Sequence, residues 1–379
     1  MYKKRIGWLV AVCLLFFGCP VWVRAETISL SSLSAVVYEP QTGRVLYEKD
    51  AHTPRAMAST TKLMTALIGA ENVEMSREIT ATKEAVTVEG SSMGLHAGDK
   101  ISMHDLLTGL LLSSGNDAAN TIALTVSGSL PAFAEKMNQR AQELEMRESH
   151  FVTPSGLDAD DHAASAYDMA LLGAAVLRNP TLASICALKT ATIELGDPKR
   201  KATISNHNRL LSLYSHCIGL KTGFTKKSGR CLVSAAQKDG VTLVVATLNG
   251  GDYWNDHIKL YEYGFELVEA CTLPTPVLPQ VPVSNGETGW LPLRMETPEP
   301  AIVPKGSSPN VTMTVELPRF VLAPVEAGET IGYVRYWLDG NELCVVPLQA
   351  AYRIEALPVA GYPQQVWRLF CRMLRELLW

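Results

Sequence analysis

The chain has 379 residues, enough for about two domains at roughly 100 to 200 residues each. Hydrophobic residues make up 47% of it and charged residues 19%, which excludes collagen-like, low-complexity and disordered proteins. The net charge of -4 leaves no basic excess to neutralise a phosphate backbone, so we expect no nucleic-acid partner. The 8 cysteines are too few for a disulfide scaffold of this length.

Residues 1–25 are predicted to be a secretory signal peptide. A basic start at residues 3–5 precedes an uncharged run from Ile6 to Val23, and Ala25 ends a small-residue cleavage site. Without cleavage, the run would be near the lower length limit for a membrane span. A lipoprotein site at Cys19 is less favoured, because two phenylalanines stand where smaller residues are usual. We therefore expect cleavage and export.

The segment 27–270 is predicted to form an antiparallel sheet with helices packed on it. Turn residues 40–43 predict a hairpin, and Lys238-Asp239-Gly240 predicts a second turn between buried strands. The expected strands are Ser34 to Tyr38, Arg44 to Tyr47, Cys231 to Ala235 and Thr242 to Leu248. The expected helices are Thr60 to Leu67, Met103 to Leu112, Asn116 to Thr125, Leu130 to Leu144 and Tyr167 to Leu177.

The composition of the chain changes after Cys271. Four prolines and Asn285-Gly286 predict a linker over 271–286. Alternating hydrophobic runs follow, and the Asp339-Gly340 pair is a strong hairpin signal between two of them. We therefore predict a small all-β domain over 287–356.

The last segment, 361–379, is predicted to be an amphipathic helix. Its apolar residues recur at helical spacing: Val366, Leu369, Phe370, Met373, Leu374, Leu377 and Leu378. Three arginines, at 368, 372 and 375, fall on the opposite side, with Trp367 and Trp379 at the margins. This pattern is typical of a helix that lies in a membrane interface, although a terminal helix packed on the protein's own core has a similar stripe.

A serine and a lysine are spaced to meet on one helical face. Ser59 precedes Lys62 by three residues, where a helix is expected to begin. A serine hydroxyl needs a neighbouring base to act as a nucleophile, and a lysine is such a base when burial or a nearby cation lowers its pKa. The pattern alone is weak, because Ser-x-x-Lys occurs by chance about once or twice in a chain this long. Alone, Ser59 would be a helix cap and Lys62 a solvated lysine.

Two further motifs make the Ser59–Lys62 pattern a specific signal. Ser114-Gly115-Asn116 follows the leucine-rich helix, and Lys221-Thr222-Gly223 precedes a strand-like run. Together with Ser59 and Lys62 they match the set found in penicillin-binding proteins and class A β-lactamases. The chain resembles the serine-type D-alanyl-D-alanine carboxypeptidases, the low-molecular-mass penicillin-binding proteins. The resemblance runs from about Ser34 to Leu267 and includes the surrounds Gly109 to Ala119, Thr153 to Asp158 and Asn206 to Leu211.

The resemblance implies an acyl-enzyme mechanism. Ser59 would attack the bond between the two terminal D-alanines of a peptidoglycan stem peptide, and Lys62 would accept its proton. Ser114 would relay a proton to the leaving amine, and Asn116 would hold the substrate amide and contact Lys62. The remaining implied substrate-binding residues are Lys221, Thr222, Gly223 and Phe224. Of these, Lys221 would keep Lys62 neutral and attract the substrate carboxylate, Thr222 would bind it, and Gly223 would let the substrate lie against the backbone.

The backbone N–H groups of Ser59 and Phe224 would form the oxyanion hole. Phe224 stands where several family members have histidine, so we expect a changed rate or preference without loss of activity. The second motif has glycine where class A β-lactamases have aspartate, and no glutamate matches their deacylating residue. Both differences favour a carboxypeptidase. Two alternatives remain. One is a serine β-lactamase or D,D-endopeptidase on the same fold, and the other is a non-catalytic wall-binding relative.

No metal or cofactor is expected. The chain has no His-Glu-x-x-His motif, and His162 with Asp168 only loosely resembles the ligands of zinc D,D-peptidases. His207 reads as a structural residue near the site. Cys217 and Cys231 flank Lys221 and are either a disulfide or buried free thiols. The expected partners are the peptidoglycan stem peptide, β-lactams as inhibitors, and the outer face of the bacterial cytoplasmic membrane through the tail helix.

Overall fold

A computed structural model describes residues 28–358 and 362–377. The predicted signal peptide lies outside the described residues. The main sheet has five antiparallel strands in the order β2-β1-β9-β8-β7. In that order they are Arg44–Lys49, Ser34–Glu39, Val241–Gly250, Gly229–Lys238 and Cys217–Thr225. The strand β7 is therefore an edge strand, with one side free of strand pairing.

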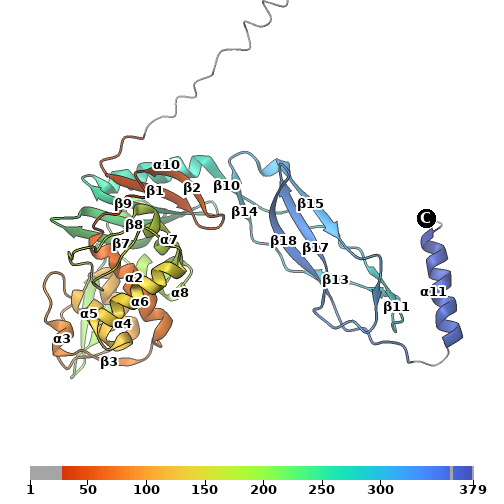
Figure 1. Cartoon of the computed structure of the whole chain (residues 1–379), viewed down its shortest axis with the longest axis horizontal. Helices are drawn as coiled ribbons and strands as arrows, with labels where there is room; N and C mark the ends of the chain where they lie inside the picture. The colour runs from red at the N-terminus through yellow and green to blue at the C-terminus, as the bar shows by residue number, and fades with distance from the viewer. Residues whose placement is uncertain (1–27, 359–361, 378–379) are drawn as a thin grey trace, which may run out of the picture. The chain divides into compact units, whose positions relative to one another are not determined.

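Helices cover both faces of this sheet. Gly264 of α10 (Tyr253–Leu267) packs against Val37 and Leu243, whereas Gly173 of α7 (Ala166–Leu177) packs against Val233 and Val244. Because side chains alternate along a strand, these contacts put α10 and α7 on opposite faces, as Figure 1 shows. The predicted fold class, an antiparallel sheet with helices, is confirmed.

The α7 face also carries a helical cluster and a smaller sheet. The cluster comprises the 3₁₀ turn η1 (Ala58–Thr61), α2 (Lys62–Asn72), α3 (Lys83–Val86), α4 (Met103–Leu112), α5 (Asn116–Ser127), α6 (Leu130–Glu143) and α8 (Pro180–Ala187). The short helix α9 (Leu210–Leu213) precedes β7, and Tyr214 at its end stacks on Tyr261 of α10. The sheet has the order β3-β4-β5-β6, with strands Glu78–Thr80, Lys100–Ser102, Thr190–Leu195 and Arg200–Ser205. Most of α4 is buried, so it forms the centre of the largest core.

The remainder is rich in β-structure. A short antiparallel pair joins β10 (Val268–Cys271) to β14 (Ala301–Pro304). A three-stranded sheet has the order β12-β11-β16, with strands Trp290–Leu291, Val281–Ser284 and Val321–Leu322. A four-stranded sheet has the order β13-β18-β17-β15, with strands Leu293–Met295, Asn341–Ala350, Thr330–Leu338 and Val311–Glu316. The short turn η2 (Ser308–Asn310) precedes β15, and α11 (Tyr362–Leu377) is the last helix.

The structure differs from the sequence predictions in several places, among them the strand β11, which lies inside the predicted linker 271–286. The helix expected from Thr60 begins at Lys62, after a 3₁₀ turn, and runs on to Asn72. Lys221-Thr222-Gly223 lies inside β7, a strand that was not predicted, and precedes β8, which contains the predicted strand Cys231 to Ala235. The helix α10 was not predicted, because its buried stripe contains polar and aromatic residues such as His257 and Tyr261, which a pattern of aliphatic residues does not reveal.

Candidate active site

Ser59 lies in the turn η1, immediately before α2. The preceding residue, Ala58, is buried and has a positive φ of 48°, a strained conformation for a residue with a Cβ. Ser59 itself is half-buried, while Thr60 and Thr61 are fully buried. The strained turn thus leaves the Ser59 side chain half-exposed beside Lys62 and holds its neighbours in the core.

Lys62 contacts Ser59 from the first turn of α2. Its Nζ lies 2.9 Å from Ser59 Oγ and donates a second hydrogen bond of 2.5 Å to the Ser155 carbonyl. The side chain is fully buried. Burial is the main cause that holds the pKa of Lys62 well below its ordinary value; the charge of Lys221 lowers it further, and Asp117 opposes both. Lys62 is therefore suited to be a neutral base.

The segment 153–158 supports the nucleophile turn. The Pro154 carbonyl accepts a 2.6 Å hydrogen bond from Thr65 Oγ1, and the Ser155 carbonyl is the second Lys62 partner. Gly156 has a φ of 81°, and a Cβ there would collide with the Ala58 carbonyl. The sequence alone could not assign this role, because the contacts join residues about a hundred positions apart.

The edge strand β7 brings Lys221 and Gly223 to the same place. Lys221 is buried, its Nζ donates to the Thr222 carbonyl at 2.8 Å, and burial lowers its pKa to about 7. A Cβ on Gly223 would lie 2.9 Å from the Met57 carbonyl and 3.0 Å from the Ser59 nitrogen. The glycine is thus needed for β7 to approach the nucleophile turn, a reason additional to the predicted one of substrate access.

Ser114 and Asn116 approach from the junction of α4 and α5. Ser114 is buried, with a positive φ of 61°. Asn116 is the first residue of α5, and its side-chain amide donates 2.6 Å to the Glu89 carbonyl. The described hydrogen bonds of Lys62 go to Ser59 and Ser155, so the contact that we expected between Asn116 and Lys62 is not among them. The sequence did not predict that Asn116 would bind the segment around Glu89.

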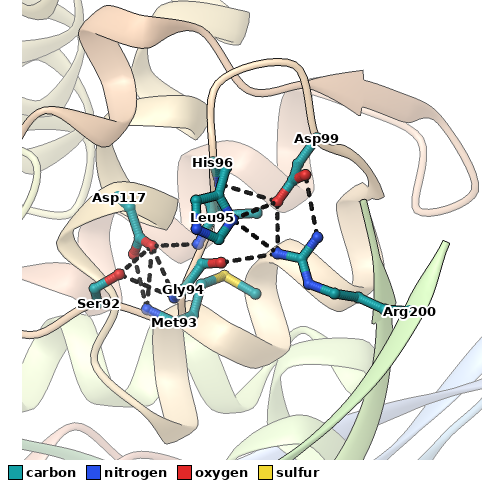
Figure 2. A network of polar contacts seen from close by, with 8 residues as sticks. All are labelled: Ser92, Met93, Gly94, Leu95, His96, Asp99, Asp117 and Arg200. Atoms are coloured by element: carbon teal, nitrogen blue, oxygen red, sulfur yellow. Dashed lines mark hydrogen bonds and ion pairs between the residues drawn. The ribbon is translucent and has the colours of Figure 1, made fainter. Parts of the chain in front are cut away.

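Asp117 anchors this segment, as Figure 2 shows. Its carboxylate accepts hydrogen bonds from the hydroxyl of Ser92 at 2.5 Å and from the backbone nitrogens of Met93, Gly94 and Leu95 at 3.0 to 3.1 Å. Asp117 lies in the first turn of α5, where a negative charge interacts favourably with the helix dipole. The sequence missed its larger role, which is to hold a loop that lies beside the site.

A second ion pair holds the far end of the same loop. Arg200 of β6 binds Asp99 at 2.7 Å and donates 3.0 Å to the Gly94 carbonyl. On the inner side, the Met93 side chain fills the space where a Cβ on Gly109 would stand. The loop 92–99 is therefore fixed from α4, α5 and β6 together.

The other candidate residues have structural partners. His162 bonds Thr61 Oγ1 at 2.9 Å through its ring, and Asp168 accepts from Ser149 Oγ at 2.7 Å. No cluster of three or more potential metal ligands occurs within 28–358 and 362–377. His207 is only partly shielded from solvent. This partial burial lowers its pKa, and the charge of Lys221 lowers it further, which places His207 near Lys221.

The two cysteines that flank Lys221 are both buried free thiols. Cys217 pairs with Ala236 and Cys231 pairs with Gly223 in the register of β7 and β8, so the two do not face each other. Of the two predicted alternatives, the structure therefore has free thiols and no disulfide between Cys217 and Cys231.

Two family models match the chain. The D-alanyl-D-alanine carboxypeptidase model matches residues 22–251, and the C-terminal domain model of penicillin-binding protein 5 matches residues 275–356. The chain is 30% identical to D-alanyl-D-alanine carboxypeptidase DacC of Escherichia coli, over 93% of this chain and 92% of the relative. It is 29% identical to DacF of Bacillus subtilis, over 93% of this chain and 94% of the relative.

Solved structures agree with these relatives. Penicillin-binding protein 5 of Haemophilus influenzae has a TM-score of 0.66 at 27% identity, covering 87% of this chain and 99% of that one. The carboxypeptidase DacD of Francisella tularensis has a TM-score of 0.62 at 26% identity, covering 89% and 97%. With its serine, lysine and edge strand in this arrangement, the chain belongs to the D-alanyl-D-alanine carboxypeptidase family of serine hydrolases.

Proposed function

We propose that the protein removes the terminal D-alanine from peptidoglycan pentapeptides through an acyl-enzyme on Ser59. The contact of 2.9 Å between Lys62 Nζ and Ser59 Oγ, inside a buried site, carries this proposal. The neutral amine of Lys62 takes the hydroxyl proton as Ser59 attacks the carbonyl between the two D-alanines. Ser114 passes a proton to the departing D-alanine, and water then releases the shortened peptide.

The groups on β7 bind the substrate in this proposal. The free edge of β7 pairs with the extended peptide as an added strand. The backbone N–H groups of Ser59 and Phe224 stabilise the oxyanion, and each such donor lowers the barrier by roughly 3 kcal/mol. Lys221 supplies positive potential, and Thr222 hydrogen-bonds the substrate carboxylate. Asn116 holds the substrate amide.

Acylation by a β-lactam tests the nucleophile. The intact mass of the mature protein after incubation with penicillin should rise by one penicillin, and the adduct should be absent in Ser59→Ala. Release of D-alanine from a pentapeptide then identifies the activity. Rapid penicillin turnover would instead indicate a β-lactamase, and the absence of any adduct would contradict the enzyme mechanism.

We further propose that the chain is exported by a signal peptide at 1–25 and held at the outer face of the cytoplasmic membrane by its tail helix. The remaining units in this proposal are a catalytic domain at 27–270, a linker at 271–286 and a β domain at 287–356, with the strand β11 (Val281–Ser284) of the linker paired to strands of the β domain. In α11 the apolar side chains are exposed, with Trp367 at 64% and Met373 at 60%. Such a face, opposite a row of arginines, suits a membrane interface.

No single helix in the described ranges is long and apolar enough to cross a bilayer; only the bent pair α7 and α8 passes that test of length and composition. Deletion of residues 361–379 should leave D-alanine release from a soluble peptide intact and abolish binding to liposomes. Unchanged liposome binding would refute the anchor.

A further inference from the structure

A groove of about 770 Å³ lies beside the β2 edge of the main sheet. It is lined by residues of β1, β2 and the turn after them, by the end of α6 and the residues that follow it, and by α7. None of the lining residues belongs to the three motifs. Because β2 and β7 are the two edges of a five-stranded sheet, four strand spacings of about 4.8 Å, roughly 19 Å in all, separate the β2 edge from the substrate-binding strand.

One face of α7 forms a wall of this groove. Tyr167, Leu171, Ala174 and Arg178 line it at spacings of four, three and four residues, which place them on the same side of the helix. Arg178 is the capping residue at the carboxyl end of α7. At about 1.5 Å per residue, the wall from Tyr167 to Arg178 is roughly 16 Å long. The groove therefore has room for an extended ligand of linked rings.

Three aromatic rings in mutual contact line the groove. Tyr167 packs edge-on against Tyr38, with the ring centres 6.3 Å apart, and lies 4.9 Å from the His52 ring at an interplanar angle of 37°. Both tyrosines are partly exposed, and the His52 side chain is 54% exposed. Open aromatic rings of this kind give an apolar surface to the C–H groups of a ligand, while their polar tips remain free for hydrogen bonds.

Two guanidinium groups of the groove are available to a ligand. Arg147 and Arg178 are exposed, and none of the ion pairs within the described residues involves either of them. Burial and then Tyr167 raise the pKa of Tyr38, and the charge of Arg178 lowers it, which places this guanidinium near the Tyr38 hydroxyl. Each guanidinium has several N–H donors for oxygen acceptors.

Carboxylates of the same groove offset these two cations. Glu145 and Glu148 line it, and Glu148 lies 3.5 Å from His52 Nδ1. The third lining acid, Glu143, is paired with Arg140 at 2.9 Å. Two carboxylates thus balance two guanidiniums, so the groove has no excess charge that would select a small ion. Mixed donors and acceptors beside aromatic rings suit an uncharged ligand with many hydroxyl groups, because a hydroxyl both donates and accepts.

We propose that this groove binds the saccharide strand of peptidoglycan, with sugar rings stacked on the three aromatic rings and sugar hydroxyls hydrogen-bonded by Arg178 and Glu148. The inference rests on the proposed function, which makes the stem peptide of this polymer the substrate. Because the groove lies at the far edge of the sheet, its sugars belong to a separate part of the polymer from the peptide at β7. Binding at both places raises the effective concentration of the peptide at Ser59.

Titration with a peptide-free saccharide tests the groove directly. The probe is a tetrasaccharide of alternating N-acetylglucosamine and N-acetylmuramic acid, with its carboxyl groups amidated so that it is uncharged, and binding is followed by ligand-observed NMR. Tyr167→Ala removes a stacked ring and Arg178→Gln removes a charged donor, so each should raise the Kd about tenfold.

Tyr263→Ala is the matched control. Tyr263 is also an exposed tyrosine in an edge-on aromatic pair, 5.8 Å from Tyr47, but it does not line the groove. Its substitution should leave the Kd of the tetrasaccharide within about twofold of wild type. Thermal unfolding of each variant checks that it is folded.

Kinetics with free and glycan-linked pentapeptide give a second readout. Tyr167→Ala should raise KM for the glycan-linked peptide and leave D-alanine release from the free peptide unchanged. No binding of the tetrasaccharide to the wild-type protein, an equal loss in Tyr263→Ala, or uptake of an acidic peptide in place of the saccharide would each overturn the proposal. If the protein binds the saccharide with the expected pattern but releases no D-alanine, the proposed function fails and the saccharide site stands.

Discussion

A residue with a strained backbone conformation lies at each of the three motifs. Ala58, Ser114 and Leu220 precede or occupy the three motifs, and their φ angles are 48°, 61° and 95°. A residue with a Cβ adopts such angles only where the surrounding structure enforces them. The buried contacts around Ser59 supply that enforcement, so the nucleophile turn depends on neighbours that are distant in sequence.

Gly156 and Gly128 form a matched pair for testing this dependence. Both have positive φ angles, 81° and 74°, but a Cβ on Gly156 would strike Ala58, whereas a Cβ on Gly128 would meet nothing within 4 Å. Gly156→Ala should lower stability by about 1 to 3 kcal/mol beyond the change in Gly128→Ala and slow penicillin acylation at least tenfold. Equal effects of the two substitutions on unfolding and acylation would contradict the bracing role.

The pH dependence of kcat/KM should report Lys221. Its pKa of about 7 means that raising the pH through 7 removes its charge. The loss weakens the attraction for the substrate, whereas Lys62 stays neutral because burial is the main cause of its lowered pKa. We therefore expect kcat/KM for D-alanine release to decline on the alkaline side with an apparent pKa near 7. A flat profile from pH 6 to 9 would rule out this role.

At the scale of elements, the loop 92–99 is held in place from α5 and β6. Asp117 in α5 and Asp105 in α4 are both acids in the first turn of a helix, so they share the favourable interaction with the helix dipole. Only Asp117 is fully buried and accepts three consecutive backbone N–H groups. Comparing substitutions of Asp117 and Asp105 therefore separates the stabilisation that comes from the helix dipole from the stabilisation that comes from hydrogen bonds to the loop.

Asp117→Asn should destabilise the protein by about 1.5 to 3 kcal/mol, the range for hydrogen bonds to a charged group. Hydrogen exchange should quicken at Met93, Gly94 and Leu95, because their amides lose a carboxylate acceptor. Asp105→Asn should cost about 0.5 kcal/mol and leave those three amides protected. Unaltered exchange at 93–95 in Asp117→Asn would show that the loop is held by other contacts.

At the scale of the molecule, the described residues form separate hydrophobic cores. The largest draws on residues from Val36 to Leu248, and the two smaller ones on residues from Cys271 to Ile354. The two smaller cores share Leu293 and Leu317 at their margins, whereas neither shares a residue with the largest. The largest core and the smaller pair can therefore unfold as separate cooperative units. This organisation matches the two regions that the family models cover.

Calorimetry should therefore show two unfolding transitions in the full chain. A ligand stabilises only the unit that binds it, so acylation by penicillin should raise the midpoint of one transition and leave the other unchanged. Ser59→Ala, which cannot be acylated, should show no shift. A single transition that moves as a whole would mean that the units unfold together.

The sequence by itself determined the chemistry and the types of the elements with a clear local pattern. The spacing of Ser59 and Lys62 put both on one helical face, and the resemblance named the partners on the other two motifs. The hairpins at 40–43 and 339–340 were also predictable, because turn residues and alternation are local signals. The family, the fold class and the carboxypeptidase activity predicted in this way are confirmed.

Only the tertiary structure decided how the site is supported. The bracing of Ala58 by Gly156, the anchoring of the loop by Asp117 and the stacking of Arg230 on Phe224 join residues that no local pattern connects. Strand register decided that the side chains of Lys221 and Arg230 lie on opposite faces of the sheet. The physical reason is that burial and long-range contacts set strain, pKa and orientation, and these arise only when the chain has folded.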